Sequence, residues 1–340
     1  METKEIYNND FVAETAKIKT LLSMVKEKCD AFDRSFSINE NAINYINNNK
    51  EKIFKALDDH FKLIWGLIQD FSKEDIRKHQ KYYQDELFPL FATPPLNKRV
   101  YEKPLGYPGD YLMMNYYYDD GYEGESCYHK LMHRYSLEIP VARANINRKK
   151  YFFNVFEKVN KARNDRVKIA SFGCGPAREI IEYAETSIDA KKCEFTCIDS
   201  EPGALNYIKD RICIINKGIK VDFLNLNIKN ILKSKDNYEG VSFQDLIYSA
   251  GLFDYFSDNM AKAILNKLYS YLSDNGLLII VNVADNHDHR AYMELLGEWY
   301  LNMRSEMDML NLAGDIKGAK NIYVEKDKEN GKNLYLIIEK

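Results

Sequence analysis

Glycine, proline, tryptophan and cysteine are all scarce in this sequence of 340 residues. It has 16 glycines, 8 prolines, 2 tryptophans and 6 cysteines. Glycine and proline together make up about 7% of the chain, whereas their average usage is about 12%. This low content predicts a helix-rich chain with few turns. The six cysteines lack the spacing of a metal site, and so few of them favour a reduced cytosolic protein over a disulfide framework.

The sequence also lacks an excess of positive charge and a long hydrophobic run. Its 48 Lys and Arg residues oppose 51 Asp and Glu residues, for a formal net charge of −3, which argues against nucleic acid as the main partner. The N-terminus carries no apolar segment typical of a secretory signal. The longest apolar run, around 276–284, is too short to span a bilayer. We therefore expect a soluble, cytoplasmic protein without a membrane span, and a homo-oligomer is compatible with this composition.

The first 150 residues are predicted to form an α-helical domain. Apolar residues recur at helical spacing over residues 11–29 and 53–68. Residues 103–124 are rich in glycine, tyrosine and aspartate, and this composition favours a loop over a regular element. We interpret residues 1–150 as a helical cap or substrate domain.

Strands alternate with helices from residue 167 onward. This alternation predicts right-handed βαβ units and a parallel sheet. Two further strands around Asn330-Gly331 are expected to close the chain as an antiparallel hairpin. The fold class is therefore α/β, with a Rossmann-like, mostly parallel sheet in a second domain, residues 151–340. The strands are expected at residues 167–172, 194–199, 220–224, 243–249, 277–284, 322–325 and 334–339.

The turn after the first strand carries a glycine pair, in the order Gly173-Cys174-Gly175-Pro176-Ala177. Glycine allows a sharp turn and lets a ligand approach the backbone, and the next helix presents free N–H groups there. A dinucleotide site requires a third glycine, which is absent. The shorter pattern resembles the first motif of class I S-adenosylmethionine (SAM) methyltransferases. An ordinary glycine-containing βα turn is the alternative.

The resemblance implies a SAM site along the ends of the strands. Asp199 ends the second strand, where a carboxylate accepts ribose hydroxyls in nucleotide-binding folds; its alternative role is a helix cap. After the third strand, Asn227 and the Ile228 N–H would hold the adenine. We assign Cys174 and Ser249 to the same cofactor site.

One position departs from the methyltransferase pattern. The family normally has an acidic residue two positions before the first glycine, and Ser171 stands there. The methionine end of SAM would then be held differently, and Asp110 and Arg148 are our candidates.

A narrower resemblance is spread over five motifs within residues 100–315. Together they are similar to the bacterial methyltransferase family named for extracellular factor 3-hydroxypalmitic acid methyl ester biosynthesis. That name implies methylation of a carboxylate. Residues 1–95 carry no matching motif. The five motifs are Gly106-Tyr107-Pro108-Gly109-Asp110-Tyr111, Arg134-Tyr135, Arg143-x-x-x-Asn147-Arg148, Gly251-Leu252-Phe253-Asp254-Tyr255, and Met293-Glu294 through Trp299 to Arg304.

The acceptor determines which groups the reaction needs. A carboxylate is ionised at neutral pH and requires a cationic clamp rather than a base, so Arg304 and Arg143 are candidates. An amine or hydroxyl acceptor would favour a base, for which His287 and His289 follow the fifth strand. These two histidines have no evident third partner for a metal, and none is predicted. Solvated surface side chains are the alternative for all four residues.

Aromatic and acidic residues complete the predicted site. Tyr111 and Tyr255 could place ring faces near a sulfonium, an attraction of about 0.5–2 kcal/mol per ring. Asp254 follows the fourth strand, where acceptor or methionine groups lie in related enzymes, or else it caps the next turn. We assign Tyr107 and Trp299 to acceptor binding.

Three hypotheses follow from these residues. The first is methyl transfer from SAM to a small-molecule acceptor, with a carboxyl oxygen favoured. The second is a SAM-consuming cyclase in which the SAM amine expels methylthioadenosine and forms azetidine-2-carboxylate. The third is a non-catalytic SAM-binding module whose N-terminal helices contact a protein partner.

Overall fold

A computed structural model describes residues 7–35, 39–92, 94–215, 217–233 and 240–340. The chain divides into two compact units. The first comprises residues 1–142 and 287–300, and the second comprises residues 143–286 and 301–340. The first unit is therefore built from two segments that are far apart in the sequence.

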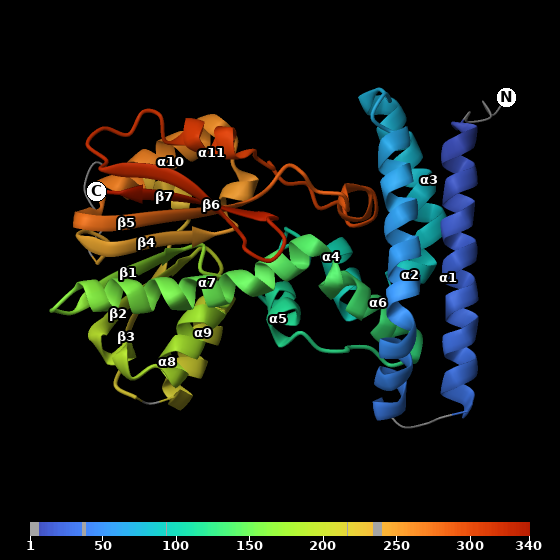
Figure 1. Cartoon of the computed structure of the whole chain (residues 1–340), viewed down its shortest axis with the longest axis horizontal. Helices are drawn as coiled ribbons and strands as arrows, with labels where there is room; N and C mark the ends of the chain where they lie inside the picture. Colours follow the sequence, from blue (N-terminus) through green and yellow to red (C-terminus); the bar gives the residue numbers. More distant parts are fainter. Residues whose placement is uncertain (1–6, 36–38, 93, 216, 234–239) are drawn as a thin grey trace. The chain divides into compact units, whose positions relative to one another are not determined.

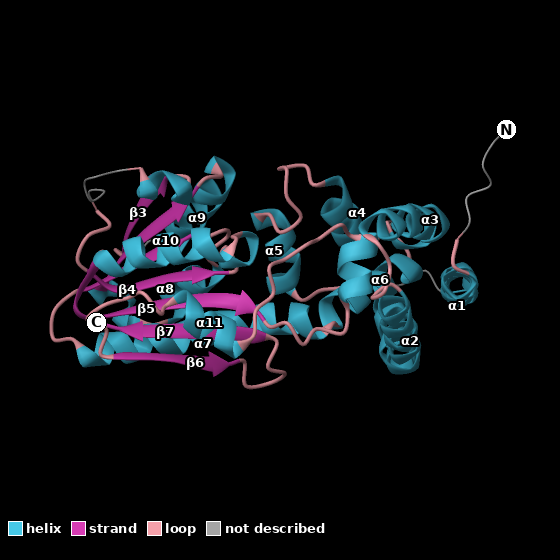
Figure 2. Ribbon diagram, turned by 90° about the horizontal axis from the view of Figure 1, so that it is seen from above, coloured by secondary structure: helices cyan, strands magenta, loops and turns pink. Residues whose placement is uncertain are grey.

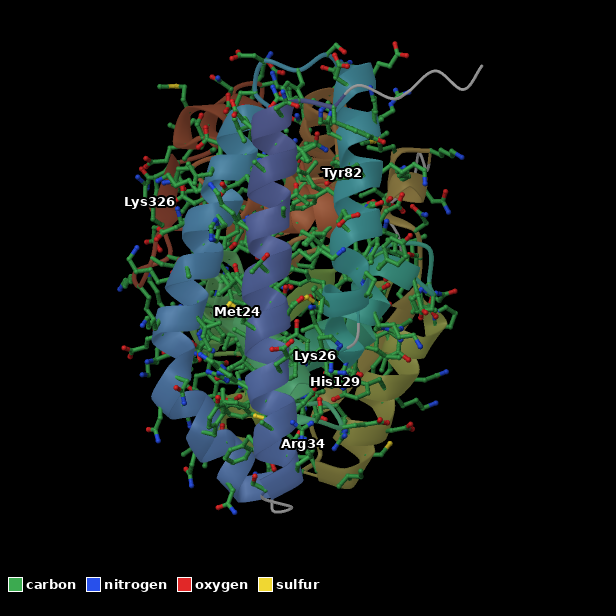
Figure 3. The ribbon with its side chains drawn as sticks, turned by 90° about the vertical axis from the view of Figure 1, so that its right-hand side faces the viewer. Met24, Lys26, Arg34, Tyr82, His129 and Lys326 are labelled. Carbon is green, nitrogen blue, oxygen red and sulfur yellow. The ribbon has the colours of Figure 1, made fainter. Side chains whose placement is uncertain are left out.

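The first unit is helical. Helix α1 has the predicted apolar stripe, in which Phe11, Ile18 and Leu22 are completely buried. Figure 3 shows α1 with α2 and α3 on its two sides, and Met24 on the outer surface of α1 is 51% exposed. The helices are α1 (Asn9–Ser35), α2 (Asn39–Leu67), α3 (Lys73–Phe91), α4 (Pro95–Glu102), α5 (Tyr111–Asp119), α6 (Cys127–Glu138) and the π-helix η4 (Ala291–Leu296).

The glycine- and tyrosine-rich segment 103–124 is not a continuous loop, and this expectation was wrong. Residues Tyr111–Asp119 form α5 because Asp110 caps its first turn, accepting hydrogen bonds from the Leu112 and Met113 N–H groups at 3.0 and 2.9 Å. The same carboxylate pairs with Arg99, whose Nε and Nη2 each lie 2.9 Å from one of its oxygens. Asp110 is completely buried. Its carboxylate is thus used inside the first unit, which corrects its assignment to the methionine end of SAM.

The second unit contains a seven-stranded sheet in the order β3-β2-β1-β4-β5-β7-β6. Strands β1 to β5 are parallel, while β7 runs antiparallel to both β5 and β6. Figure 2 shows the strands side by side, with β3 and β6 at the two edges. The strands are β1 (Val167–Phe172), β2 (Cys193–Asp199), β3 (Lys220–Asn225), β4 (Gln244–Ala250), β5 (Leu272–Val283), β6 (Asn321–Lys326) and β7 (Asn333–Glu339).

Helices cover both faces of this sheet (Figure 1). Along β1, Ile169 packs in the core that includes α7, α8 and α9, whereas Ala170 and Phe172 pack in the core that includes α10 and α11. A strand buried on both faces is apolar without alternation, as the sequence of β1 is. The helices are α7 (Pro140–Ala162), α8 (Arg178–Thr186), α9 (Pro202–Ile215), α10 (Asp258–Ser270) and α11 (Glu306–Leu312), with the short 3₁₀ helices η1 (Ile188–Lys192), η2 (Ile228–Leu232) and η3 (Phe253–Tyr255).

The strand order reverses direction between β1 and β4, since β2 and β3 lie on one side of β1 and β4 and β5 on the other. In open parallel sheets, ligands bind at the carboxyl ends of the strands beside such a switch point. This places the candidate site in the second unit. Within the described ranges, the helices are too short or too polar to cross a bilayer.

The capping role of Asp110 can be tested by urea unfolding followed by circular dichroism. Asp110→Ala should lower the free energy of unfolding by roughly 2–4 kcal/mol, because it removes a cap and leaves the mostly buried Arg99 without its carboxylate. Ser72→Ala is the matched control, since Ser72 caps the exposed start of α3 and should cost about 1 kcal/mol. Equal losses in the two variants would contradict this role.

Candidate active site

The turn between β1 and α8 is held by the end of β2. The Ile198 carbonyl accepts hydrogen bonds from the Gly173 and Cys174 N–H groups at 2.9 and 3.1 Å. Gly173 and Gly175 adopt φ values of +64° and +53°, a left-handed conformation that favours glycine. A Cβ on Gly173 would lie 2.8 Å from Leu252 Cδ2, whereas a Cβ on Gly175 would meet nothing within 4 Å. The turn therefore packs against the loop after β4 on one side and is open at Gly175.

Asp199 connects β2 to the same turn. Its Oδ2 accepts a hydrogen bond from the Gly175 N–H at 2.8 Å, and its Oδ1 accepts one from the Glu201 N–H at 2.9 Å. The residue is 8% exposed, and burial raises the pKa of its carboxyl group. Since each carboxylate oxygen can accept a second hydrogen bond, this geometry still allows ribose hydroxyls to donate to it.

Two residues assigned to the cofactor turn their side chains into the protein. Ser249 is completely buried, and its hydroxyl donates to the Phe172 carbonyl at 2.8 Å. Cys174 is buried in the apolar core beside Cys197, and burial raises the pKa of its thiol. The two side chains thus serve the internal structure of this sheet edge, and a cofactor-binding role for the two residues stays a prediction.

Asn227 and Ile228 follow β3, as expected. The exposed Asn227 accepts a hydrogen bond from the Lys229 N–H at 3.0 Å and thereby begins η2. Ile228 is 6% exposed and packs in the core with α10. An adenine-binding role for this pair remains a prediction.

Arg148 and Asp254 lie at the end of β4. Gly251 has a φ of +93°, and a Cβ there would be 3.0 Å from Arg148 Nη1 and 3.6 Å from Asp254 Oδ2. The Asp254 Oδ1 accepts a hydrogen bond from the Val283 N–H at 2.8 Å, and burial raises the pKa of this carboxyl group to about 7. Tyr255 is 38% exposed in the same loop. A cation and a buried acid thus share one glycine-lined corner.

Arg304 does not act as a clamp for a carboxylate acceptor, and this prediction was wrong. It is 2% exposed and lies in an extended segment that bridges to Ala284, not on a helix. Its five N–H donors all have partners within the second unit. They bond to the carbonyls of Phe253 and Phe256, to Asn282 Oδ1, and twice to Asp258 Oδ1. Arg304 therefore fixes the loop that carries Asp254 and Tyr255.

Glu179 is a buried acid that was not among the residues predicted from the sequence. It lies in the first turn of α8, is 5% exposed, and its Oε1 accepts a hydrogen bond from the Tyr248 hydroxyl at 2.7 Å. Burial raises the pKa of its carboxyl group, and Arg148 acts in the opposite direction. Its position four residues after Gly175, at the start of the helix, was the available signal.

The predicted acceptor residues of the first unit have contacts of their own. Trp299 is 7% exposed and lines a mostly apolar cavity of about 40 Å³ together with Tyr292 and Ser136. His287 does not offer a free base, because its Nε2 lies 2.8 Å from Met293 Sδ and its Nδ1 accepts the His289 N–H.

His289 instead bonds to a carboxylate, with its Nε2 2.9 Å from Asp58 Oδ1. Tyr107 and Tyr111 in the first unit and Arg143 in the second are half-buried, and their roles remain predictions. In the part of the chain that the structure describes, no three His, Cys, Asp or Glu side chains are grouped as metal ligands.

Comparisons with known proteins found likenesses in fold and one partial likeness in sequence. No protein-family model matches the chain. The chemotaxis protein methyltransferase of Borreliella burgdorferi is 26% identical over 153 residues, which are 36% of this chain and 54% of that protein. The chain thus spans about half the length of this curated relative.

Two solved structures illustrate the likeness in fold. A possible exported protein from Bordetella parapertussis has a TM-score of 0.50 at 17% identity, covering 62% of this chain and 72% of its own. Magnesium protoporphyrin IX methyltransferase from Synechocystis, with S-adenosylhomocysteine bound, has a TM-score of 0.45 at 12% identity, covering 59% and 87%. The predicted fold class is confirmed: a Rossmann-like sheet with an antiparallel C-terminal hairpin, accompanied by an N-terminal helical region.

The raised pKa of Asp254 predicts a dependence of stability on pH. Its native pKa of about 7 lies above the ordinary value of 3.8, so the native state binds more protons than the unfolded state between these values. The free energy of unfolding should therefore fall as the pH rises from 4 to 7, by up to roughly 4 kcal/mol from this group.

Asp254→Asn should abolish this part of the decline while keeping an oxygen for the Val283 N–H. Urea unfolding at pH 5 and pH 8 measures the change in the free energy of unfolding between these pH values. Asp285→Asn, at an exposed position, is the control. A decline as steep in Asp254→Asn as in the unsubstituted chain would refute the assignment.

Proposed function

We propose that this protein is a SAM-dependent methyltransferase that acts on a small-molecule acceptor. One observation carries the proposal. The glycine turn after β1 and the acid at the end of β2 are hydrogen-bonded to each other, and the turn packs on the loop after β4. This arrangement lies at the switch point of a parallel sheet, where such folds bind nucleosides.

The residues at this edge fit the parts of SAM. Open space above Gly175 lets a ligand approach the backbone. Asp199 would accept the ribose hydroxyls, with Asn227 and Ile228 beside the adenine. Arg148 supplies a positive charge near the end of β4 for the methionine carboxylate. The chemotaxis methyltransferase of Borreliella burgdorferi supports the same assignment through its partial sequence likeness.

The protein contributes orientation and electrostatics to the reaction. SAM, when bound, supplies a methyl group already activated by a sulfonium. The chain's task is then to hold the two reactants in line. Arg304 keeps the loop of Asp254 and Tyr255 in one conformation through bonds to Phe253 and Phe256. With a pKa of about 7, Asp254 can hold or release a proton near neutral pH, and the half-exposed Tyr255 can present its ring to the sulfonium.

A carboxyl oxygen is the favoured acceptor atom. This follows the narrower resemblance to the methyl ester biosynthesis family, and a carboxylate nucleophile needs no general base. Since the donors of Arg304 are used inside the protein, Arg143 is the remaining arginine that we assign to the carboxylate. Tyr107, Tyr111 and Trp299 remain proposed acceptor contacts.

The non-catalytic alternative loses the observation that motivated it. The apolar stripe of α1 is buried within the first unit, where Phe11, Ile18 and Leu22 have no exposed surface. A stripe packed in this way is intramolecular core and does not call for a partner.

Binding and turnover test the proposal together. By calorimetry, SAM and S-adenosylhomocysteine should bind the full chain, and Asp199→Ala should weaken both roughly 10- to 100-fold, the usual effect of losing hydrogen bonds to a charged group. Asp222→Ala, on the exposed side of β3, should leave the affinity unchanged. Absence of SAM binding to the unsubstituted protein would reject the proposal.

Methyl-labelled SAM incubated with cell extract should transfer its label to a small molecule. Release of the label by mild alkali would identify an ester, whereas a stable label would reject the carboxyl oxygen as acceptor. Methylthioadenosine formed from SAM alone would instead support the cyclase.

A further inference from the structure

The first unit contains a cavity of about 40 Å³ that is bounded by helices α3 to α6 and by η4. All fourteen described residues that line it belong to this unit. One water needs roughly 10–15 Å³ of such space, so about three waters, or one small ring, fit without movement of the walls. Aromatic rings favour one another as neighbours, and five of the lining residues are aromatic. They are Phe88, Phe91, Tyr117, Tyr292 and Trp299.

The walls of this cavity carry no charge. Of the fourteen described residues that line it, none is an aspartate, glutamate, lysine, arginine or histidine. Burial raises the pKa of Tyr292 to about 12, so its hydroxyl is also uncharged at neutral pH. An ion that entered such surroundings would lose its hydration without gaining a countercharge, which is unfavourable. The cavity therefore suits a neutral molecule.

Three side-chain oxygens are gathered among the lining residues. Ser136 Oγ lies 2.7 Å from Asn97 Oδ1 and 2.7 Å from the Tyr292 hydroxyl, which lies 3.1 Å from the same Asn97 Oδ1. These three contacts share only two hydroxyl protons, because the amide oxygen has none to donate. The Met132 carbonyl, 3.0 Å from Ser136 Oγ, competes for one of them. At least one of the three contacts therefore lacks a proton, and the hydroxyl of a ligand can supply it.

The wall that η4 forms is fixed from two sides. Gln84 of α3 donates a hydrogen bond to the Leu295 carbonyl at 2.9 Å. A Cβ on Gly297 would lie 2.9 Å from the Met293 carbonyl oxygen and 3.1 Å from Val100 Cγ1, so only glycine lets the end of η4 pack this closely on α4. Helices of the π type are rare and are found frequently at functional sites. The space beside η4 is thus bounded by elements that hold each other in place.

We propose that this cavity binds a small, uncharged aromatic alcohol, a molecule of the phenol type. Its ring would lie among the aromatic side chains, and its hydroxyl would donate to the oxygens of Asn97, Ser136 and Tyr292. The inference goes beyond the proposed function, because it concerns the first unit alone and requires no SAM.

Titration of the full chain with phenol and with toluene tests the site. The two probes have nearly the same shape, but only phenol can donate a hydrogen bond. Both should bind, and phenol should bind about 3- to 10-fold more tightly, the usual effect of one neutral hydrogen bond. Trp299 lines the cavity and Trp65 is the other tryptophan of the chain, so in Trp65→Phe the emission of Trp299 should change when either probe is added. Absence of phenol binding to the unsubstituted chain would overturn the inference.

Tyr292→Phe tests the group of three oxygens. In this variant the Ser136 proton alone can satisfy Asn97 Oδ1, so the preference for phenol over toluene should fall below about twofold. Tyr122→Phe is the matched control, since it also removes a tyrosine hydroxyl that donates to an asparagine, Asn47, at 2.6 Å. This control should keep the preference. The same preference in Tyr292→Phe as in the unsubstituted chain would contradict the assigned role of these oxygens.

The size of the ligand is tested by filling the cavity. Ala92 lines it, and Ala92→Leu should weaken both probes at least about tenfold, because overfilled interiors force their neighbours to move. Ala31→Leu, on the exposed side of α1, should change neither affinity. Undiminished binding by a folded Ala92→Leu chain would place the probes elsewhere and overturn the inference.

A larger probe answers the same question without a variant, should Ala92→Leu not fold. The second ring of 1-naphthol exceeds the room in the cavity, so 1-naphthol should bind the unsubstituted chain more weakly than phenol. Adsorption to an exposed apolar surface would follow the apolar area and favour 1-naphthol. Tighter binding of 1-naphthol would therefore overturn the inference. None of these outcomes involves SAM, so they leave the proposed function untouched.

Discussion

The hydrogen bonds between the end of β2 and the turn after β1 determine what this sheet edge can bind. The Ile198 carbonyl accepts two N–H groups of the turn, and Asp199 accepts a third. These bonds require the left-handed conformations of Gly173 and Gly175, and they aim the start of α8 at the same edge. Without them, the acid of β2, the turn and the buried Glu179 would have no common geometry.

The parts of this site that could be predicted from sequence are those with a local cause. Glycine at 173 and 175 is required by backbone conformation, and Asp199 ends an apolar strand at a regular distance from them. The parallel strands and the closing antiparallel hairpin followed from the alternation of strands with helices and from the Asn330-Gly331 turn, whereas the order of the strands was not predicted. By contrast, a glutamate in the first turn of a helix ordinarily faces solvent. Glu179 is instead buried and accepts a hydrogen bond from Tyr248 of β4, a contact between residues 69 positions apart.

The wrong assignments share a physical reason. Arg304 and Asp110 are polar residues at motif positions, and a polar residue in a motif can serve the backbone as well as a ligand. Arg304 has one carboxylate, one amide and two carbonyls as partners, and Asp110 both caps a helix and neutralises Arg99. Burial of these groups demands that all their hydrogen bonds be satisfied internally. Composition and spacing do not distinguish a polar residue that bonds to the protein from one that binds a ligand. That difference depends on which residues lie next to it in the folded chain.

Buried charge at this edge of the sheet is mostly negative. Three buried acids, Asp199, Glu179 and Asp254, end or follow β2, β1 and β4, and burial raises the pKa of each. Arg148 lowers the pKa of both Glu179 and Asp254. Burying more acids than bases at one edge has a free-energy cost, because burial disfavours the charged form of each carboxyl group. Under the proposed function, the positive charge of a bound sulfonium would offset part of this cost.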